Sequence, residues 1–200
     1  GNSIASGGNY NVAVGDEAGT AITTGDGNVA VGYQALSTED ANGESVAIGY
    51  RALKVQNAGA AAYNTAVGYD AGVAVTTGLR NALLGAFSGD ALTDADDNVA
   101  IGTFALTADT LGSRSVAVGK EALAAQNFTT ATNSYNTAVG AFAGNAVPTG
   151  IENTLIGVLA GDALTVGNNN VAVGSQALST DTKGDRNVAV GRAALFSQNF

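Results

Sequence analysis

Carboxylates are the side chains of this chain best suited to chemistry, because the sequence contains no His and no Cys. Three of them fall within four residues, at Asp94, Asp96 and Asp97. Hard oxygen ligands of this kind suit Ca²⁺. The sequence has neither the spacing of an EF-hand nor the Gly-Gly-x-Gly-x-Asp repeat of calcium-binding rolls. We therefore expect solvated acidic loops here, and we keep these three residues as the candidate calcium site.

The composition excludes several classes of enzyme. Without His or Cys there is no zinc finger, thiol nucleophile, Ser-His-Asp triad or imidazole metal site. Paired carboxylates such as Asp16-Glu17 and Glu39-Asp40 could in principle hydrolyse a glycosidic bond. No such pair departs from the repeat described below, whereas a catalytic site normally interrupts a repeat. We expect neither enzymatic activity nor a cofactor.

The charge balance bears on partners. The chain has 8 Lys and Arg against 17 Asp and Glu, a net charge of −9, which argues against nucleic acid as a ligand. Charged residues make up 12% of the chain and apolar residues 46%, and this balance argues against disorder. No apolar stretch approaches the roughly 20 residues that cross a bilayer, and no signal-peptide pattern opens the sequence. We expect no membrane insertion.

A repeat organises the chain. The string Asn-Val-Ala-Val-Gly recurs with variations, and its final residue is called the repeat glycine below. Successive repeat glycines are 17 residues apart, except for an interval of 19 after Gly49 and one of 21 after Gly119. Eleven copies fill the chain, so we expect one repeat domain over residues 1–200. The repeat glycines are Gly15, Gly32, Gly49, Gly68, Gly85, Gly102, Gly119, Gly140, Gly157, Gly174 and Gly191.

The repeat predicts an all-β fold, a parallel β-solenoid of eleven coils of about 17 residues. β-branched residues at alternate positions that end in Gly are typical of a short strand and a sharp turn. A unit of this length cannot bury a core alone, but stacked copies align their columns into ladders. A helical array is disfavoured by the frequent Gly and the Val-x-Val alternation. With adjacent strands about 4.8 Å apart, ten intervals predict a rod roughly 48 Å long.

The column before each repeat glycine is predicted to fill the interior. Because successive strand residues alternate faces, the Ala beside each member should point the other way. The column consists of Val14, Val31, Ile48, Val67, Leu84, Ile101, Val118, Val139, Ile156, Val173 and Val190.

Asparagine forms the most regular polar column, four places before the repeat glycine. Ser45 and Ser115 are its exceptions. Stacked Asn side chains can hydrogen-bond from coil to coil and satisfy turn backbone, so we interpret the column as a structural ladder, with ligand binding as the alternative. The Gly column is likewise structural, through positive φ or close approach. The ladder consists of Asn11, Asn28, Asn64, Asn81, Asn98, Asn136, Asn153, Asn170 and Asn187.

A longer period of four coils lies on the first. The two long intervals predict protruding loops at residues 55–63 and 126–135, because extra residues cannot enter the ladder. Six of the eight basic residues lie in the coils that precede such loops, where we expect salt bridges between chains, with Glu44, Glu121 or Asp185 as partners. Binding of an anionic glycan is the alternative. These basic residues are Arg51, Lys54, Arg114, Lys120, Arg186 and Arg192.

Aromatic residues occupy two neighbouring columns. Tyr33, Tyr50 and Tyr69 directly follow the repeat glycine, whereas Phe87, Phe104 and Phe142 stand one place later. If the chain is extended there, the Tyr set and the Phe set face opposite sides.

The repeat resembles the head repeats of trimeric autotransporter adhesins, whose coils carry Asn-Ser-Val-Ala-Ile-Gly. The match is close at residues 44–49 and 113–119, and similar repeats occur in bacteriophage tail fibres. The resemblance implies a parallel β-roll that assembles as a homotrimer, outside the cell, on a virion tail fibre or a cell surface. It also implies attachment to a host-surface glycan or protein. The coil is longer than the adhesin coil, and the sequence shows no neck, stalk or anchor of that family, which favours the tail-fibre interpretation.

Elementary packing gives an independent reason to expect several chains. Besides the Val/Ile column, the repeat has an Ala column and an alternating Leu/Gly column. We expect one thin coil to cover one of these two and to leave the other exposed along the rod, as soluble monomers avoid. Three such stripes meeting on an axis would be buried. The expected function is thus that of a structural and adhesive fibre segment.

Two other functions stay open. One is a carbohydrate-binding or depolymerising spike. The other is an ice-binding solenoid, which requires a regular Thr ladder at strand spacing. The candidate Thr residues do not recur in every coil, and this counts against ice binding. They are Thr23, Thr65, Thr76, Thr137 and Thr154.

Overall fold

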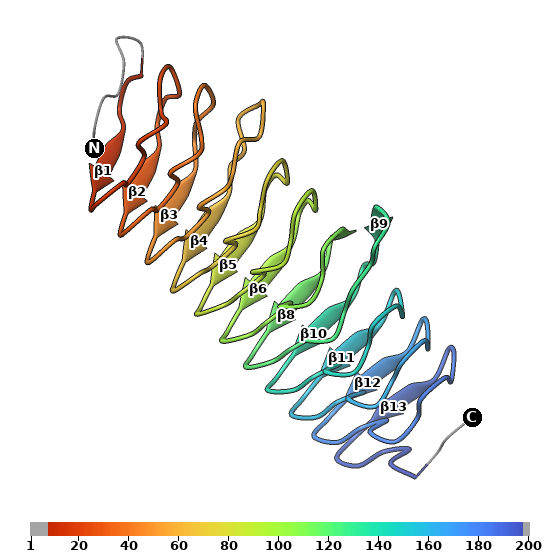
Figure 1. The fold of residues 1–200 in the computed structure, drawn as a ribbon. Helices are drawn as coiled ribbons and strands as arrows, with labels where there is room; N and C mark the ends of the chain where they lie inside the picture. The colour runs from red at the N-terminus through yellow and green to blue at the C-terminus, as the bar shows by residue number, and fades with distance from the viewer. Residues whose placement is uncertain (1–7, 198–200) are drawn as a thin grey trace.

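The computed structural model describes residues 8–197, and over this range the chain is an all-β rod (Figure 1). Eleven strands of three residues form one parallel sheet whose order follows the sequence. Equivalent residues pair, as Val12 does with Val29 and Ala13 with Ala30. The strands are β1 (Val12–Val14), β2 (Val29–Val31), β3 (Val46–Ile48), β4 (Thr65–Val67), β5 (Ala82–Leu84), β6 (Val99–Ile101), β8 (Val116–Val118), β10 (Thr137–Val139), β11 (Thr154–Ile156), β12 (Val171–Val173) and β13 (Val188–Val190). The predicted parallel solenoid of about eleven coils is confirmed.

The repeat glycine closes each strand for two reasons at once. Gly49 has φ of 141°, a backbone conformation that side chains disfavour. A Cβ added to it would lie 2.1 Å from the carbonyl oxygen of Gly68 in the next coil. No other residue type fits a position where the backbones of two coils approach so closely.

Backbone ladders also hold the turns that follow the strands. In the second coil, Gln34 and Leu36 both have left-handed backbone, with φ of 52° and 48°. The Gln34 amide donates to the Asp16 carbonyl in the preceding coil, and the Leu36 amide donates to the Ala52 carbonyl in the following one. Hydrogen bonds between coils therefore run along the sides of the rod as well as through the sheet.

The prediction that the Val/Ile column fills the interior is wrong. Ile101 is 39% exposed, whereas the neighbouring Ala100 is fully buried, and the same pattern recurs in the other described coils. The two residues do face opposite sides, but Ala faces inward. The centre of each strand is Ala, except for Leu83 and Leu155, whose side chains fill the space left by nearby glycines such as Gly72 and Gly144. The larger β-branched side chains are left on the outer face.

Side-chain volume in the interior is exchanged between two positions of the coil. Where the fourth residue after the repeat glycine is Leu, the seventh is acidic or Gln, and where the fourth is Gly, the seventh is apolar. At Gly72 an added Cβ would lie 2.6 Å from Leu83 Cδ1 and 3.3 Å from Val75 Cγ2. The Leu/Gly column and the Ala column therefore both pack inside one chain. This corrects the expectation that one of them would be exposed.

The two long loops project over a shorter span than predicted. Gln56, Ala62, Gln126 and Ser134 are fully buried, and residues 59–60 and 129–131 are exposed. In the second loop, β9 (Thr132–Asn133) pairs in parallel with β7 (Gly112–Ser113), and Figure 1 shows β9 standing out from the rod. The ends of each loop belong to the coil, and its tip alone projects.

Candidate functional site

The outer surface of the eleven-stranded sheet is the most extensive distinctive feature of the molecule. We call it the sheet face, and it consists of the first and third residues of the eleven strands of that sheet. These residues are Val, Ile, Leu, Thr and Ala, with no charged side chain among them. In the middle of the rod, Ile48, Leu84, Ile101 and Ile156 are 37–39% exposed. Contiguous exposed apolar surface of this extent is typical of interaction sites on proteins.

Thr residues contribute little to the sheet face. Thr65, Thr137 and Thr154 lie on it as the first residues of their strands. Thr76 and its equivalent in the next coil, Thr93, lie in the loops instead, where each hydroxyl donates to a backbone carbonyl of the following coil. The sheet face therefore carries no continuous Thr ladder of the kind that the ice-binding hypothesis requires.

The asparagine column forms a hydrogen-bonded ladder beneath the sheet. Asn81 is representative: its backbone amide donates to Asn64 Oδ1 at 2.8 Å, and its Nδ2 donates to the Ala95 carbonyl at 2.7 Å. Asn64, Asn81, Asn98 and Asn153 are at most 1% exposed. The buried Asn residues therefore tie their strands to neighbouring coils, and their side-chain amides are used within the protein. Asn11 and Asn187, in the first and last coils, are half-buried, and Asn187 Nδ2 donates to the Asp181 carboxylate.

Glutamine replaces asparagine where the ladder is interrupted. Ser115 stands in the Asn column, and Gln126 Nε2 donates to Ser115 Oγ at 2.8 Å while its Oε1 accepts from Asn136 Nδ2 at 2.9 Å. Gln126 Nε2 also donates to Asp109 at 2.5 Å, and Asp109 further accepts the amide of Phe128. The whole network is buried. The seventh place after the repeat glycine carries the signal for it in the sequence, which sequence reasoning missed.

Related networks lie at the equivalent places four coils before and four coils after. Gln56 Nε2 donates to Glu39 at 2.9 Å, and Gln56 Oε1 accepts from Asn64. The second carboxylate oxygen of Glu39 is buried and has no partner among the described residues. Asp181 accepts from the amides of Lys183 and Gly184 and from Asn187 Nδ2. The Gln expected next to it falls at position 198, outside the described residues.

The candidate calcium residues each contact a side chain of the preceding coil. Asp97 pairs with Arg80 at 2.6 Å, and Asp96 lies 3.3 Å from the same guanidinium. Asp94 accepts a hydrogen bond from the Thr77 hydroxyl at 2.6 Å. The Arg80 guanidinium holds the pKa of Asp97 below its ordinary value. The structure thus places these carboxylates in contacts between coils.

Basic residues make their contacts within the chain mainly to neighbouring coils. Arg51 binds Asp70 of the next coil through two hydrogen bonds of 2.7 and 2.5 Å, and this bond raises the pKa of Arg51. Lys120 lies 3.2 Å from Glu121, one of the partners that the sequence suggested. Glu44 instead bonds to Tyr63 and raises the pKa of that phenol.

Tyr33, Tyr50, Tyr69, Phe87 and Phe104 form one stack, so the prediction that the Tyr set and the Phe set face opposite sides is wrong for these five residues. The ring centroids of Tyr50 and Tyr69 are 4.8 Å apart, those of Tyr69 and Phe87 are 5.3 Å apart, and those of Phe87 and Phe104 are 5.0 Å apart. Phe87 has φ of 57°, so the chain there is a tight turn to which strand alternation does not apply. Ring faces are covered by neighbouring rings, which leaves only their edges for a partner.

Residues 8–197 enclose no pocket, and no three of their acidic side chains lie close enough to hold a metal ion together. No helix in this range is long and apolar enough to cross a membrane. No family model, curated protein or solved structure matches the chain. The geometry of its own surface is therefore the basis on which a function is argued.

Proposed function

We propose that this chain is a structural and adhesive fibre segment that works as a homotrimeric rod. In this proposal the sheet faces of three copies pack around a common axis parallel to the rod. The single observation that carries it is the sheet face, an uncharged apolar surface that runs through all the described coils. Burial of such a surface stabilises an assembly by roughly 25 cal/mol per Å² of apolar area.

The shape and the backbone suit a mechanical role. Hydrogen bonds connect each coil to the next at the sheet, at the turns and along the asparagine ladder. In such a stack each coil contacts only its neighbours, and the length grows with the number of coils. A rod of this kind separates what is attached to its two ends by a fixed distance.

Three copies and an adhesive role are supported by the resemblance of the repeat to trimeric adhesin heads and phage tail fibres. The proposed location is accordingly extracellular, on a virion or a cell surface, with a host-surface glycan or protein as the partner. Residues 59–60 and 129–131 at the loop tips are exposed and therefore accessible for such a contact.

The assembly is tested by measuring the mass of the purified chain in solution by light scattering and sedimentation. The expected value is about 59 kDa, three times the 19.6 kDa of one chain. A mass of one chain at micromolar concentration would overturn the proposal, and a mass of two chains would replace the trimer with a face-to-face dimer.

The adhesive part needs a separate experiment. Fluorescently labelled protein is added to whole bacterial cells before and after enzymatic removal of their surface polysaccharide. Binding that is lost with the polysaccharide supports attachment to a glycan, and binding that survives supports a protein receptor. Absence of binding to any cell of a broad panel would contradict adhesion and leave a purely structural rod.

A further inference from the structure

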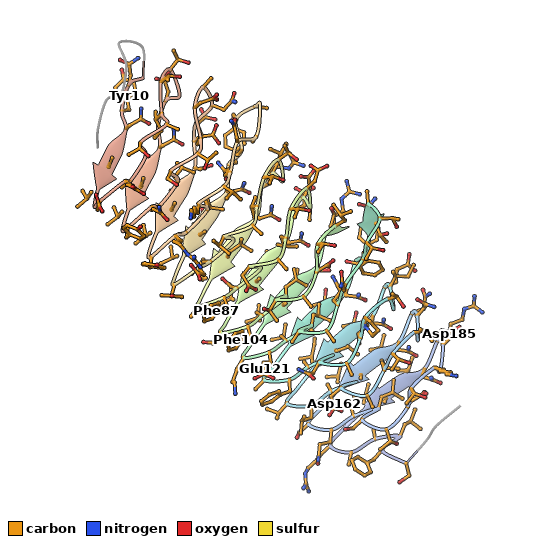
Figure 2. The ribbon with its side chains drawn as sticks, in the orientation of Figure 1. Tyr10, Phe87, Phe104, Glu121, Asp162 and Asp185 are labelled. Carbon is orange, nitrogen blue, oxygen red and sulfur yellow. The ribbon has the colours of Figure 1, made fainter. Side chains whose placement is uncertain are left out.

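The two edges of the sheet face carry different side chains. We call the residues five places before the repeat glycines the start edge, and the residues two places after them the end edge. Figure 2 shows Phe87, Phe104 and Glu121 of the end edge along one long side of the rod, with Tyr10 of the start edge on the other. A three-residue strand lies between the edges and spans roughly 10 Å. The Cα atoms of the two edges of a coil are therefore well apart, and Arg51 and Glu121 of the end edge bond to Asp70 and Lys120 instead of to the start edge of their own coil.

In two coils the two edges carry opposite charges. In the coil of Gly49 the start edge is Glu44 and the end edge is Arg51. In the coil of Gly119 the same two places hold Arg114 and Glu121, with the charges exchanged. An exchange that preserves opposite charge at two places whose side chains bond elsewhere within the chain points to a meeting between chains.

Three further coils have side chains at their two edges that suit a contact. In the coil of Gly140 both edges are aromatic, and in the coil of Gly174 both edges carry amides. Arg80 of the start edge shares its coil with Phe87 of the end edge, which suits a cation–π contact. The remaining described coils combine a charged or small residue with an unrelated side chain. The aromatic and amide pairs are Tyr135 with Phe142 and Asn169 with Gln176.

We infer that, in the proposed trimer, the end edge of each chain packs against the start edge of the next chain at the same level of the rod. Three sheet faces around one axis have strands that all run in the same sense around it. The end of each strand then lies beside the beginning of its neighbour's, a head-to-tail contact that closes after three copies. This inference rests on the proposed homotrimer. It adds the register of the three chains and the residues of each contact between an end edge and a start edge, which we call a seam.

The charged side chains remain available for such a contact. Arg51 keeps 34% of its side chain exposed beside Asp70, Arg114 keeps 44% and Glu121 keeps 31%. Each has a partner within its own chain, so the contact between chains would extend an existing ion pair into a network. Two seams of opposite polarity, at Gly49 and at Gly119, would also fix the register, because a shift by one coil separates both pairs.

Disulfide trapping tests the seam directly, because the chain contains no Cys of its own. Asn169→Cys and Gln176→Cys are combined in one chain, and the assembly is oxidised with copper phenanthroline, which accepts the electrons of the two thiols. A disulfide requires Cα atoms roughly 4.4–6.8 Å apart, less than the strand between the two places spans. The bond can therefore form only between chains.

The expected product on a non-reducing denaturing gel is a covalent ring of three chains, with two-chain species as intermediates. Each single variant should stay at one chain, because a start edge does not meet another start edge. Asn169→Cys combined with Gln34→Cys is the matched control, since these places belong to different levels, and it should not cross-link.

The outcomes separate the seam from the trimer. If the double variant has the mass of three chains in solution but does not cross-link, the seam is wrong and the trimer stands. If the wild-type chain has the mass of one chain, the trimer and the seam both fall. Efficient cross-linking of a single variant would show a symmetric contact between like edges and would also overturn the inference.

A double-mutant cycle on Glu44→Gln and Arg51→Gln gives a second measurement. The cycle removes the effect of each residue on its own chain, including the contact of Arg51 with Asp70, and isolates their coupling. We expect a coupling of roughly twofold to fivefold per contact in the association constant, as for exposed ion pairs. Additive effects on association would contradict the contact.

Discussion

The two sides of one three-residue strand obey different rules. In β6, Ala100 faces a coil interior with no exposed surface, and Ile101 faces outward and is 39% exposed. Hydrophobicity alone would place the larger residue inside. The centre of the strand is Ala, or Leu at Leu83 and Leu155 where nearby glycines leave room, and the β-branched side chains of the strands face outward. The sheet face is therefore an apolar surface without packing partners in its own chain, whereas the opposite side of each strand is packed within one chain.

The largest effect is expected from Ala100→Asp. This change places a carboxylate in the interior, where Ala100 pairs in register with Leu83 and Ala117 and no cation is at hand. An unpaired buried charge costs at least about 3 kcal/mol. Urea unfolding followed by circular dichroism should show this loss, with the ladder interrupted near β6. Unchanged unfolding would mean that this side of the strand is not the interior.

Ile101→Asp is the matched change one residue further on, and it should act on assembly instead of folding. Three carboxylates would converge on the axis of the trimer, and like charges brought together cost several kcal/mol. We expect the association constant to fall by at least about 100-fold.

The β-sheet signal of the Ile101→Asp variant at 25 °C should be preserved, and light scattering should report one chain. Val166→Asp serves as the control, because Val166 is 47% exposed, against 39% for Ile101, but lies off the sheet face. A loss of assembly in the control variant would point to another interface.

Gln126→Leu sharpens the comparison inside the coil. An apolar side chain of similar size at this place leaves Ser115, Asp109 and Asn136 without one hydrogen bond each. Each unsatisfied buried group costs about 1–3 kcal/mol, so we expect a loss of about 2–4 kcal/mol after partial relaxation. Asn57→Leu is the control at an exposed amide outside both edges and should be nearly silent in the same urea titration. Equal effects would show that the buried network carries no stability.

The smallest effect is expected at the loop tip that belongs to neither side of the strand. Replacing Thr129, Thr130 and Ala131 together with Ser should change the unfolding free energy by less than about 0.5 kcal/mol, because the three residues are exposed. Calorimetric scans of this variant and of Phe128→Ala give the comparison, since Phe128 is 7% exposed and anchors the loop. A large loss from the tip variant would mean that the tip packs against another part of the assembly.

Several features could be predicted from the sequence because they depend on spacing alone. A constant interval between repeat glycines fixes the number of coils and the register, since a stack aligns like with like. The Gly column could be assigned for the same reason: Gly49 has both positive φ and a backbone neighbour closer than a Cβ allows. The exchange of Leu and Gly four places after the repeat glycine was visible in the sequence, but its compensation seven places after was not used.

Other features depend on the width of the coil, which no spacing reveals. The Val/Ile column would be interior in a thicker solenoid, and Tyr69 and Phe87 would face opposite sides if the chain after the repeat glycine were extended. The left-handed turn at Phe87 brings both rings into one stack. Gln126 looked like one polar residue in a loop until the coils on either side placed Asp109 and Asn136 against it.

The sequence by itself determined the repeat, the parallel order of the strands and the alternation of residues across each strand, because all three follow from periodicity. Only the tertiary structure decided which side of the strand is inside, because that depends on the distance between the walls of one coil. At the centre of a strand the space between those walls admits Ala, and it admits Leu83 and Leu155 because glycines of neighbouring turns leave room for them. The same limit leaves the apolar sheet face outside the chain that makes it, and the proposed assembly with other copies follows from that surface.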